Sequence, residues 1–217
     1  MSDGDGDGAT MTSPARPAGA PAEPARRRAL LAAAAAPALL GAACHDAPRN
    51  PNPRADVPLV PVPVDLPRYM GRWYVIAHLP YWAERGFVAS RAEWTLRPDG
   101  RIDDRFIARR GFDGPERRFH FVDTALPGGG EWRVRLLWPI HVSQLTLFVD
   151  PDYRTTLLGY RGKHLGWVFA REPELDDATY RGLLARFDTF GYDTSRFLRV
   201  PQKREQLGRE GFEPAAG

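Results

Sequence analysis

The sequence predicts an all-β fold, an eight-stranded antiparallel up-and-down barrel with one C-terminal α-helix packed outside it. Between residues 73 and 171 apolar side chains recur with a period of two, and clusters of turn residues separate the alternating segments. The links are short and lack a helical pattern, so consecutive strands are expected to pair antiparallel. Such a meander can close on itself, which removes its edges and leaves room for side chains or one small ligand.

Eight segments carry the strand pattern. The strongest turn signal between them is Pro98-Asp99-Gly100, a typical hairpin sequence. The expected strands, in chain order, are 73–79, 89–97, 101–109, 117–123, 131–138, 142–149, 153–160 and 165–171.

A helix is expected after the last strand. Asp176 is a suitable N-cap and Gly191 a suitable stop. Leu183, Phe187 and Phe190 fall on one face of this helix, with helical spacing. That face is expected to press on the outside of the barrel.

The composition disfavours two classes of protein. The formal net charge is +3 and the arginines are scattered, so no nucleic-acid partner is expected. The single cysteine, Cys44, excludes an internal disulfide and Cys-based zinc ligation.

Six Trp, seven Tyr and eleven Phe are many for one modest domain. They predict either a filled aromatic core or an apolar pocket.

Residues 1–43 are expected to be a disordered preamble and export signal. Gly, Ala, Pro, Ser and Asp dominate residues 1–25. Three arginines, 26–28, then precede an apolar run over 30–43, which suits a signal peptide and is too short to span a membrane. Residues 27–31, RRALL, resemble a twin-arginine signal for export of folded proteins. An ordinary secretory signal remains the alternative.

Cys44 is the expected lipidation site. The small residues Gly41-Ala42-Ala43 before it resemble a bacterial lipobox, although Leu40 stands one place further back than is usual. Acyl chains on this sulfur would tether the protein to a membrane. His45 at the following position resembles the sorting pattern for the outer membrane, on its periplasmic side. The alternative is cleavage after Ala43, which leaves a soluble periplasmic protein.

Three further regions follow from composition. In residues 44–63 proline recurs at nearly every third place, which predicts an extended, lipid-anchored tether. Residues 64–201 form the folded domain. Residues 202–217 show no pattern of buried residues and are expected to be disordered.

Four motifs, in order and suitably spaced, resemble the lipocalin family, and in particular the bacterial outer-membrane lipocalins related to apolipoprotein D. The likeness covers about residues 64–201. The resemblance implies a lipocalin calyx in which Arg171 lies across Trp73 and, with Gly71, seals the base. The matching stretches are Gly71-Arg72-Trp73-Tyr74, Glu84-Arg85-Gly86 with the hairpin 94–100, residues 150–154 (DPDYR) and residues 167–173 (WVFAREP).

The resemblance also implies a binding function without a cofactor. A fatty acid or lysophospholipid would be stored or carried inside the barrel, with Arg105 or Arg109 near its headgroup. The alternative is that the inward side chains simply fill a solid core. The residues expected to line the pocket are Trp94, Phe106, Phe121, Trp132, Val134, Leu136, Trp138, Trp167 and Phe169, with Phe119 as a further candidate.

Two other functions remain open. Some lipocalin relatives are isomerases or de-epoxidases, but no nucleophile–base motif is present, and His78, His120, His141 and His164 lack metal-ligand spacing. We therefore expect no catalytic or metal-binding residues. An envelope protein-docking module is the second alternative, with Pro80-Tyr81-Trp82 as its candidate patch. The sequence is also compatible with a homodimer.

Overall fold

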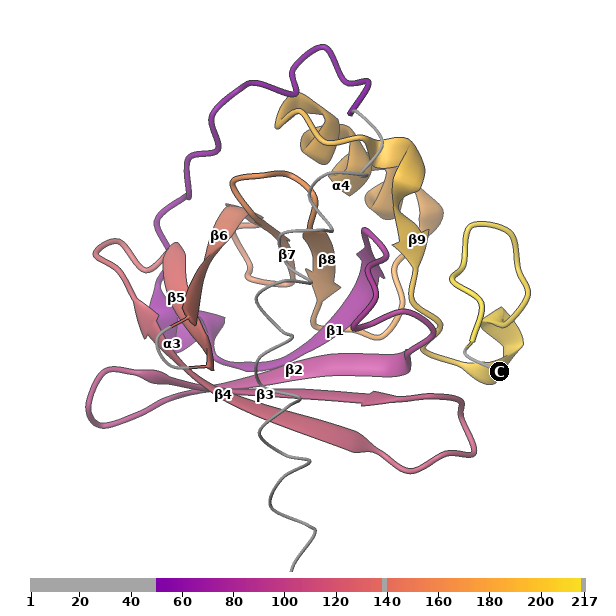
Figure 1. Cartoon of the computed structure of the whole chain (residues 1–217), viewed down its shortest axis with the longest axis horizontal. Helices are drawn as coiled ribbons and strands as arrows, with labels where there is room; N and C mark the ends of the chain where they lie inside the picture. The colour runs from indigo at the N-terminus through magenta and orange to yellow at the C-terminus, as the bar shows by residue number, and fades with distance from the viewer. Residues whose placement is uncertain (1–49, 138–139, 216–217) are drawn as a thin grey trace, which may run out of the picture. The chain divides into compact units, whose positions relative to one another are not determined.

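The computed structural model describes residues 50–137 and 140–215, so Cys44, the expected export signal and Trp138 lie outside the described residues. In this part of the chain nine strands form one antiparallel sheet in the order β2-β3-β4-β5-β6-β7-β8-β1-β9, and β1 also pairs with β2, which closes the barrel (Figure 1). The strands are β1 (Gly71–His78), β2 (Val88–Leu96), β3 (Ile102–Arg109), β4 (Arg117–Ala125), β5 (Glu131–Leu137), β6 (Ile140–Val149), β7 (Thr155–Gly159), β8 (Gly166–Ala170) and β9 (Leu198–Arg199).

The eight-stranded antiparallel barrel predicted from the sequence is confirmed. Each of the eight expected strands is present, and its ends lie within about two residues of the observed ends, the usual uncertainty of a boundary. The ninth strand, β9, was missed. It consists of two residues that pair with Ala77 and His78 of β1, too short a segment to carry a period of its own.

A short helix, α3 (Leu66–Tyr69), precedes the first strand and lies at the base of the barrel. Asp65 caps it, and proline occupies its first turn, where the missing N–H is tolerated. Tyr69 is completely buried, and its carbonyl accepts a 2.8 Å hydrogen bond from the Trp73 indole nitrogen. Helix α3 therefore closes the base and positions the first strand.

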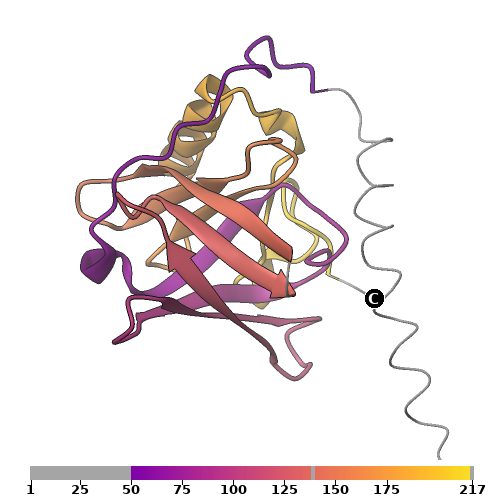
Figure 2. The same cartoon turned by 60° about the vertical axis from the view of Figure 1, so that its left-hand side comes forward.

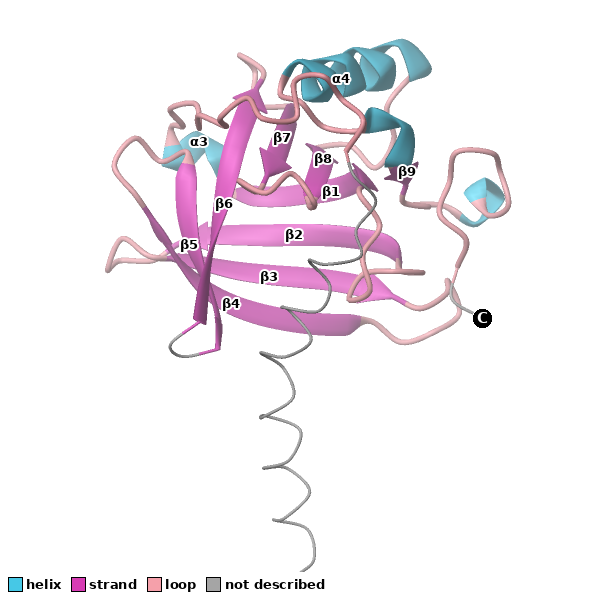
Figure 3. Ribbon diagram, turned by 45° about the horizontal axis from the view of Figure 1, so that its top comes forward, coloured by secondary structure: helices cyan, strands magenta, loops and turns pink. Residues whose placement is uncertain are grey.

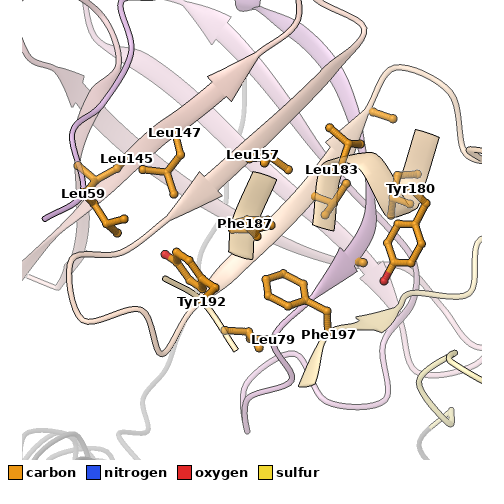
Figure 4. Close-up of a cluster of buried hydrophobic side chains, with 14 residues drawn as sticks. Leu59, Leu79, Leu145, Leu147, Leu157, Tyr180, Leu183, Phe187, Tyr192 and Phe197 are labelled. Atoms are coloured by element: carbon orange, nitrogen blue, oxygen red, sulfur yellow. The ribbon is translucent and has the colours of Figure 1, made fainter. Parts of the chain in front are cut away.

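The predicted C-terminal helix is α4 (Asp177–Thr189), which begins after its N-cap Asp176 and ends before Gly191 (φ +82°). Leu183 and Phe187 are buried against outward-facing side chains of β6, β7 and β8 (Figure 4). Since neighbouring strand residues face opposite ways, the same strands supply both this outer cluster and the barrel interior.

Residues 50–63 differ from the expected free tether, because they lie along the outside of the barrel (Figure 2). The Lys163 amine donates hydrogen bonds to the carbonyls of Arg54, Ala55 and Val57, and Leu59 is buried in the cluster under α4. Prolines block helix formation, but their carbonyls and those of their neighbours still accept hydrogen bonds. The expected extended tether therefore does not describe residues 50–63, and its first part, residues 44–49, lies outside the described residues.

Two glycines let this segment approach the wall closely. The Val62 amide donates to the Thr146 carbonyl at 2.8 Å. A Cβ on Gly130 would stand 1.9 Å from the Val62 carbonyl oxygen, and one on Gly129 would stand 2.5 Å from that of Val64. Glycine is therefore required here by space, a role that the sequence alone did not show.

Residues 202–215 differ from the expected disordered tail. The Gln202 side chain donates to the carbonyls of Val75 and Ser90, and a short 3₁₀ helix follows, η2 (Arg204–Gln206). Glu213 is 2% exposed and contacts His78 of β1. A 3₁₀ helix, η1 (Thr194–Arg196), links α4 to β9. Among the described residues, no helix is both long enough and apolar enough to cross a membrane.

Candidate binding site

The base of the barrel is sealed by aromatic rings. The Tyr69 ring centroid lies 5.2 Å from those of both Trp73 and Trp94, and Trp94 lies 5.0 Å from Trp132 and 5.6 Å from Phe169. All five side chains are buried. Such contacts between rings stabilise a core beyond the area they remove from water.

Arg171 covers this base from outside. Its guanidinium carbon lies 3.8 Å from the Trp73 ring centroid, and its Nη1 donates to the Arg72 carbonyl at 2.9 Å. The distance suits a cation–π contact. Gly71 has a φ of +100°, and a Cβ there would stand 3.2 Å from Arg171 Nη1. The structure thus brings together the three residues that the resemblance assigned to the barrel base.

The expected pocket residues fall into two groups. Trp94, Trp132 and Phe169 belong to the sealed base, where the Trp132 indole donates to the Gly129 carbonyl. Phe106 and Phe121 lie closer to the open end and are only partly buried. Of the remaining candidates, Val134 and Trp167 are buried on the inner face, Leu136 lies in β5, and Trp138 is outside the described residues.

The exposed fraction of the inward-facing aromatics increases toward the open end. Trp73 at the base is 0% exposed, whereas Phe119, two residues before Phe121 on β4, is 39% exposed. Phe119 pairs with Phe106 in the ladder, and Phe87 from the loop after β1 packs against both rings. The open half of the barrel therefore presents an accessible apolar surface.

The arginines expected at the rim do not face the interior. Arg105 alternates with the inward residues Asp104 and Phe106, so it points to the outside, where its Nη2 lies 3.8 Å from Asp103. Arg109 donates to the Gly114 carbonyl and contacts Glu116. Strand alternation therefore places Arg105 on the outer face, away from a headgroup inside the barrel.

The interior instead contains carboxyl groups for which the sequence predicted no role inside the barrel. Glu84, from the loop after β1, accepts hydrogen bonds from the Trp167 indole at 3.1 Å and the Tyr81 hydroxyl at 2.8 Å. The Glu84 carboxylate also lies 3.2 Å from Nδ1 of His78, on β1. The other ring nitrogen of His78, Nε2, lies 2.7 Å from the Glu213 carboxylate. A register shift between Val75 and Ala77 sets His78 opposite Trp167, on the inner face.

His78 is therefore an imidazolium clamped between two carboxylates. Burial lowers its pKa, but the hydrogen bonds that its ring N–H groups donate to Glu213 and Glu84 outweigh burial and raise the pKa to about 9. Glu84 is six residues and Glu213 is 135 residues from His78. The sequence carried no signal for the second contact, because Glu213 lies in the segment expected to be disordered.

A second pair of carboxyls, Asp104 and Asp123, lies deeper in the barrel on adjacent strands. Asp123 is 0% exposed, and neither of its oxygens has a hydrogen-bond partner among the described residues; the same holds for Asp104 Oδ1 and for the Trp94 indole nitrogen. Burial raises the pKa of both groups, and the neighbouring Asp104 carboxyl raises that of Asp123 further. The raised pKa values keep a proton on this pair at neutral pH.

This pair predicts an unusual dependence of stability on pH. An unfolded Asp loses its proton near pH 3.9, whereas the pKa of folded Asp123 is raised to about 8. The free energy of unfolding therefore falls as the pH rises from about 4 to about 8. We expect Asp123→Asn to be more stable than the wild type at pH 8 by about 1–3 kcal/mol, and little different at pH 4.5. Urea unfolding at both pH values measures this.

Asp103→Asn is the matched control for that measurement. Asp103 stands beside Asp104 but faces outward, and its pKa is lowered by hydrogen bonds from His120 and Arg97. Its replacement is expected to bring no gain at pH 8. Equal pH profiles for the Asp123→Asn variant and the wild type would contradict a protonated carboxyl at Asp123.

Neither the carboxylates around His78 nor the Asp104–Asp123 pair forms a metal site. Across residues 50–137 and 140–215 no three His, Cys, Asp or Glu side chains are placed to hold one ion.

A family model described as a lipocalin-like domain matches residues 64–202. The outer membrane lipoprotein Blc of Escherichia coli (strain K12) is 29% identical over 180 residues, which covers 79% of this chain and 96% of that protein. Temperature-induced lipocalin-1 of Arabidopsis thaliana is 29% identical over 151 residues, covering 64% of this chain and 80% of that protein.

Solved structures show the same fold at lower identity. Lobster apocrustacyanin A1 is 17% identical with a TM-score of 0.53, and the match covers 65% of this chain and 81% of that one. Insecticyanin from the tobacco hornworm Manduca sexta is 16% identical, also with a TM-score of 0.53, and the match covers 72% and 91% of the two chains. With the closed barrel, the sealed base and a family match over more than half its length, this chain belongs to the lipocalin family.

Proposed function

We propose that this protein binds a fatty acid or a lysophospholipid inside its barrel and stores or carries it in the bacterial cell envelope. The observation that carries the proposal is the accessible apolar surface formed by Phe106, Phe119 and Phe121 above a sealed aromatic base. A hydrocarbon chain that leaves water for such a surface gains about 0.8 kcal/mol for each buried methylene.

Binding of dodecanoate, followed by quenching of tryptophan fluorescence, tests this proposal. Phe121→Arg places a charge on the inner surface without touching the base, and we expect it to weaken binding at least tenfold, by about 1.4 kcal/mol or more. Val60→Arg is the control, because Val60 is exposed on the outside. Equal affinities of the two variants for dodecanoate would contradict an interior site.

The protein is proposed to act while attached to a membrane through Cys44, with export by the twin-arginine route. The relatives named outer membrane lipoprotein Blc support this location. We expect Cys44→Ser to move the protein from the membrane fraction to the soluble envelope fraction, since acyl chains would provide the attachment. Unchanged fractionation of Cys44→Ser after a carbonate wash would contradict the lipid anchor.

The charge state of His78 favours binding over catalysis. A general base needs a free lone pair near neutral pH, whereas the raised pKa of about 9 keeps His78 protonated. Both of its nitrogens also face carboxylates of the protein rather than open space. The clamp therefore holds the C-terminal segment against the barrel and is not proposed as a reactive centre.

A further inference from the structure

The barrel wall is only partly closed between β4 and β5. Their ladder contains two residue pairs, Thr124–Arg133 and Ala125–Trp132, both near the base. On its other side β4 remains paired with β3 along its length, from the pair of Asp123 with Ile102 to the pair of Arg117 with Ala108. Figure 3 shows β5 and β6 running across the direction of β4 rather than along it. Toward the open end, residues 117–123 of β4 therefore have no ladder partner on the β5 side within the described chain.

A hollow of about 310 Å³ lies on the outer face beside this short ladder, lined by Val122, Thr124, Arg133, Arg135 and His141. Arg133, Arg135 and His141 are exposed, and none of the three makes an ion pair with a described residue. Two neighbouring side chains on this outer face do have acidic partners: Arg118 contacts Glu116, and His120 contacts Asp103. The hollow thus gathers cationic and hydrogen-bond-donating groups without a protein anion.

The inner side of the same wall has the opposite character. Phe119 and Phe121 of β4 supply apolar surface, and Asp104 and Asp123 lie deeper. The inward-facing His78 is already shared by two carboxylates. An anionic headgroup that entered as deep as Asp104 and Asp123 would lie beside carboxyl groups, which is electrostatically unfavourable. A headgroup outside the wall would meet two guanidinium groups.

We propose that the opening between β4 and β5 is a headgroup site for amphiphiles with a phosphate or carboxylate. The hydrocarbon chain lies inside against Phe119 and Phe121, and the headgroup remains outside on Arg133, Arg135 and His141. Guanidinium groups bind such oxyanions through paired hydrogen bonds. This inference rests on the proposed binding function and adds to it the charge of the ligand and its point of entry.

Three probes with the same hydrocarbon chain test the site: dodecyl phosphate, dodecanol and dodecyltrimethylammonium, each titrated calorimetrically into the full chain. The variant is Arg133→Gln/Arg135→Gln. The control is Arg181→Gln/Arg196→Gln, which removes the same charge from exposed residues of α4 and η1. We expect the wild type and the control to bind dodecyl phosphate at least tenfold more tightly than dodecanol. The site variant should lose that preference and bind dodecanol within about twofold of the wild type.

Each other result has a separate meaning. Unchanged affinity of the site variant for dodecyl phosphate would overturn the headgroup site, and so would equal losses in the site and control variants. Inorganic phosphate that binds the wild type as tightly as dodecyl phosphate would show a free-phosphate site in which the hydrocarbon takes no part, and would overturn the proposal as well. Failure of the wild type to bind any of the three probes would instead refute the proposed binding function.

Discussion

Replacement of Trp73 by alanine is expected to lower the free energy of unfolding by about 3–5 kcal/mol, as for other large-to-small changes in protein cores. Trp73 is completely buried, and its indole packs against Tyr69 and Trp94 while Arg171 covers its face. Alanine removes all of these contacts together with the hydrogen bond to the Tyr69 carbonyl. Urea unfolding at neutral pH measures the loss.

Two further variants serve as comparisons: one removes the indole N–H of Trp73 but keeps an aromatic ring, and the other removes an exposed tryptophan. Trp73→Phe keeps an aromatic ring beneath Arg171 but lacks the N–H, so it is expected to lose less than Trp73→Ala. Trp82→Ala removes a tryptophan that is 76% exposed and should change stability by less than about 0.5 kcal/mol. A melting curve of Trp73→Ala that coincides with that of Trp82→Ala would rule out the sealed base.

Replacement of Glu213 by alanine is the second large expected effect, a loss of about 3–5 kcal/mol at pH 7. His78 is 1% exposed and Glu213 is 2% exposed, so the change leaves a buried imidazolium with Glu84 as its one remaining carboxylate partner. Removal of one member of a buried ion pair is costly because the other charge has already lost its water.

The pH dependence of the stability of Glu213→Ala provides a second test of the buried ion pair. The pKa of His78 is raised to about 9 in the folded state against about 6.5 when unfolded, so the stabilisation is complete below pH 6.5 and is lost as the pH rises through 9. The wild type should therefore lose its advantage over Glu213→Ala at pH 10. Glu210→Ala, an exposed neighbour, is the control. An unchanged stability of Glu213→Ala at pH 7 would show that this segment is not docked.

The strands and the outer helix were predictable because their signals are local. Alternation, hairpin residues such as Pro98-Asp99-Gly100 and the N-cap Asp176 act within a few residues of each other. Composition was misleading where long-range partners decide the outcome. Residues 50–63 look like a free proline-rich tether until Lys163, more than 100 residues away, is seen to bind their carbonyls.

The binding site was predictable only in part. The inward direction of Phe106 and Phe121 follows from strand alternation, but so does that of Asp104 and Asp123, to which the sequence analysis gave no role. Whether an inward tryptophan fills the base or lines a pocket depends on its level along the barrel axis, and Trp94 and Trp132 belong to the base. The position of Arg133 and Arg135 at a gap in the ladder depends on the pairing of β4 with β5, which no local pattern shows.

Native mass spectrometry of the protein, purified from its own envelope without added lipid, tests the central claim most directly. The account predicts a population carrying one fatty acid or lysophospholipid for each chain, and a Phe121→Arg variant largely free of it. A wild-type protein that emerges without lipid and also takes up no dodecanoate or dodecyl phosphate in solution would contradict a lipid-binding interior.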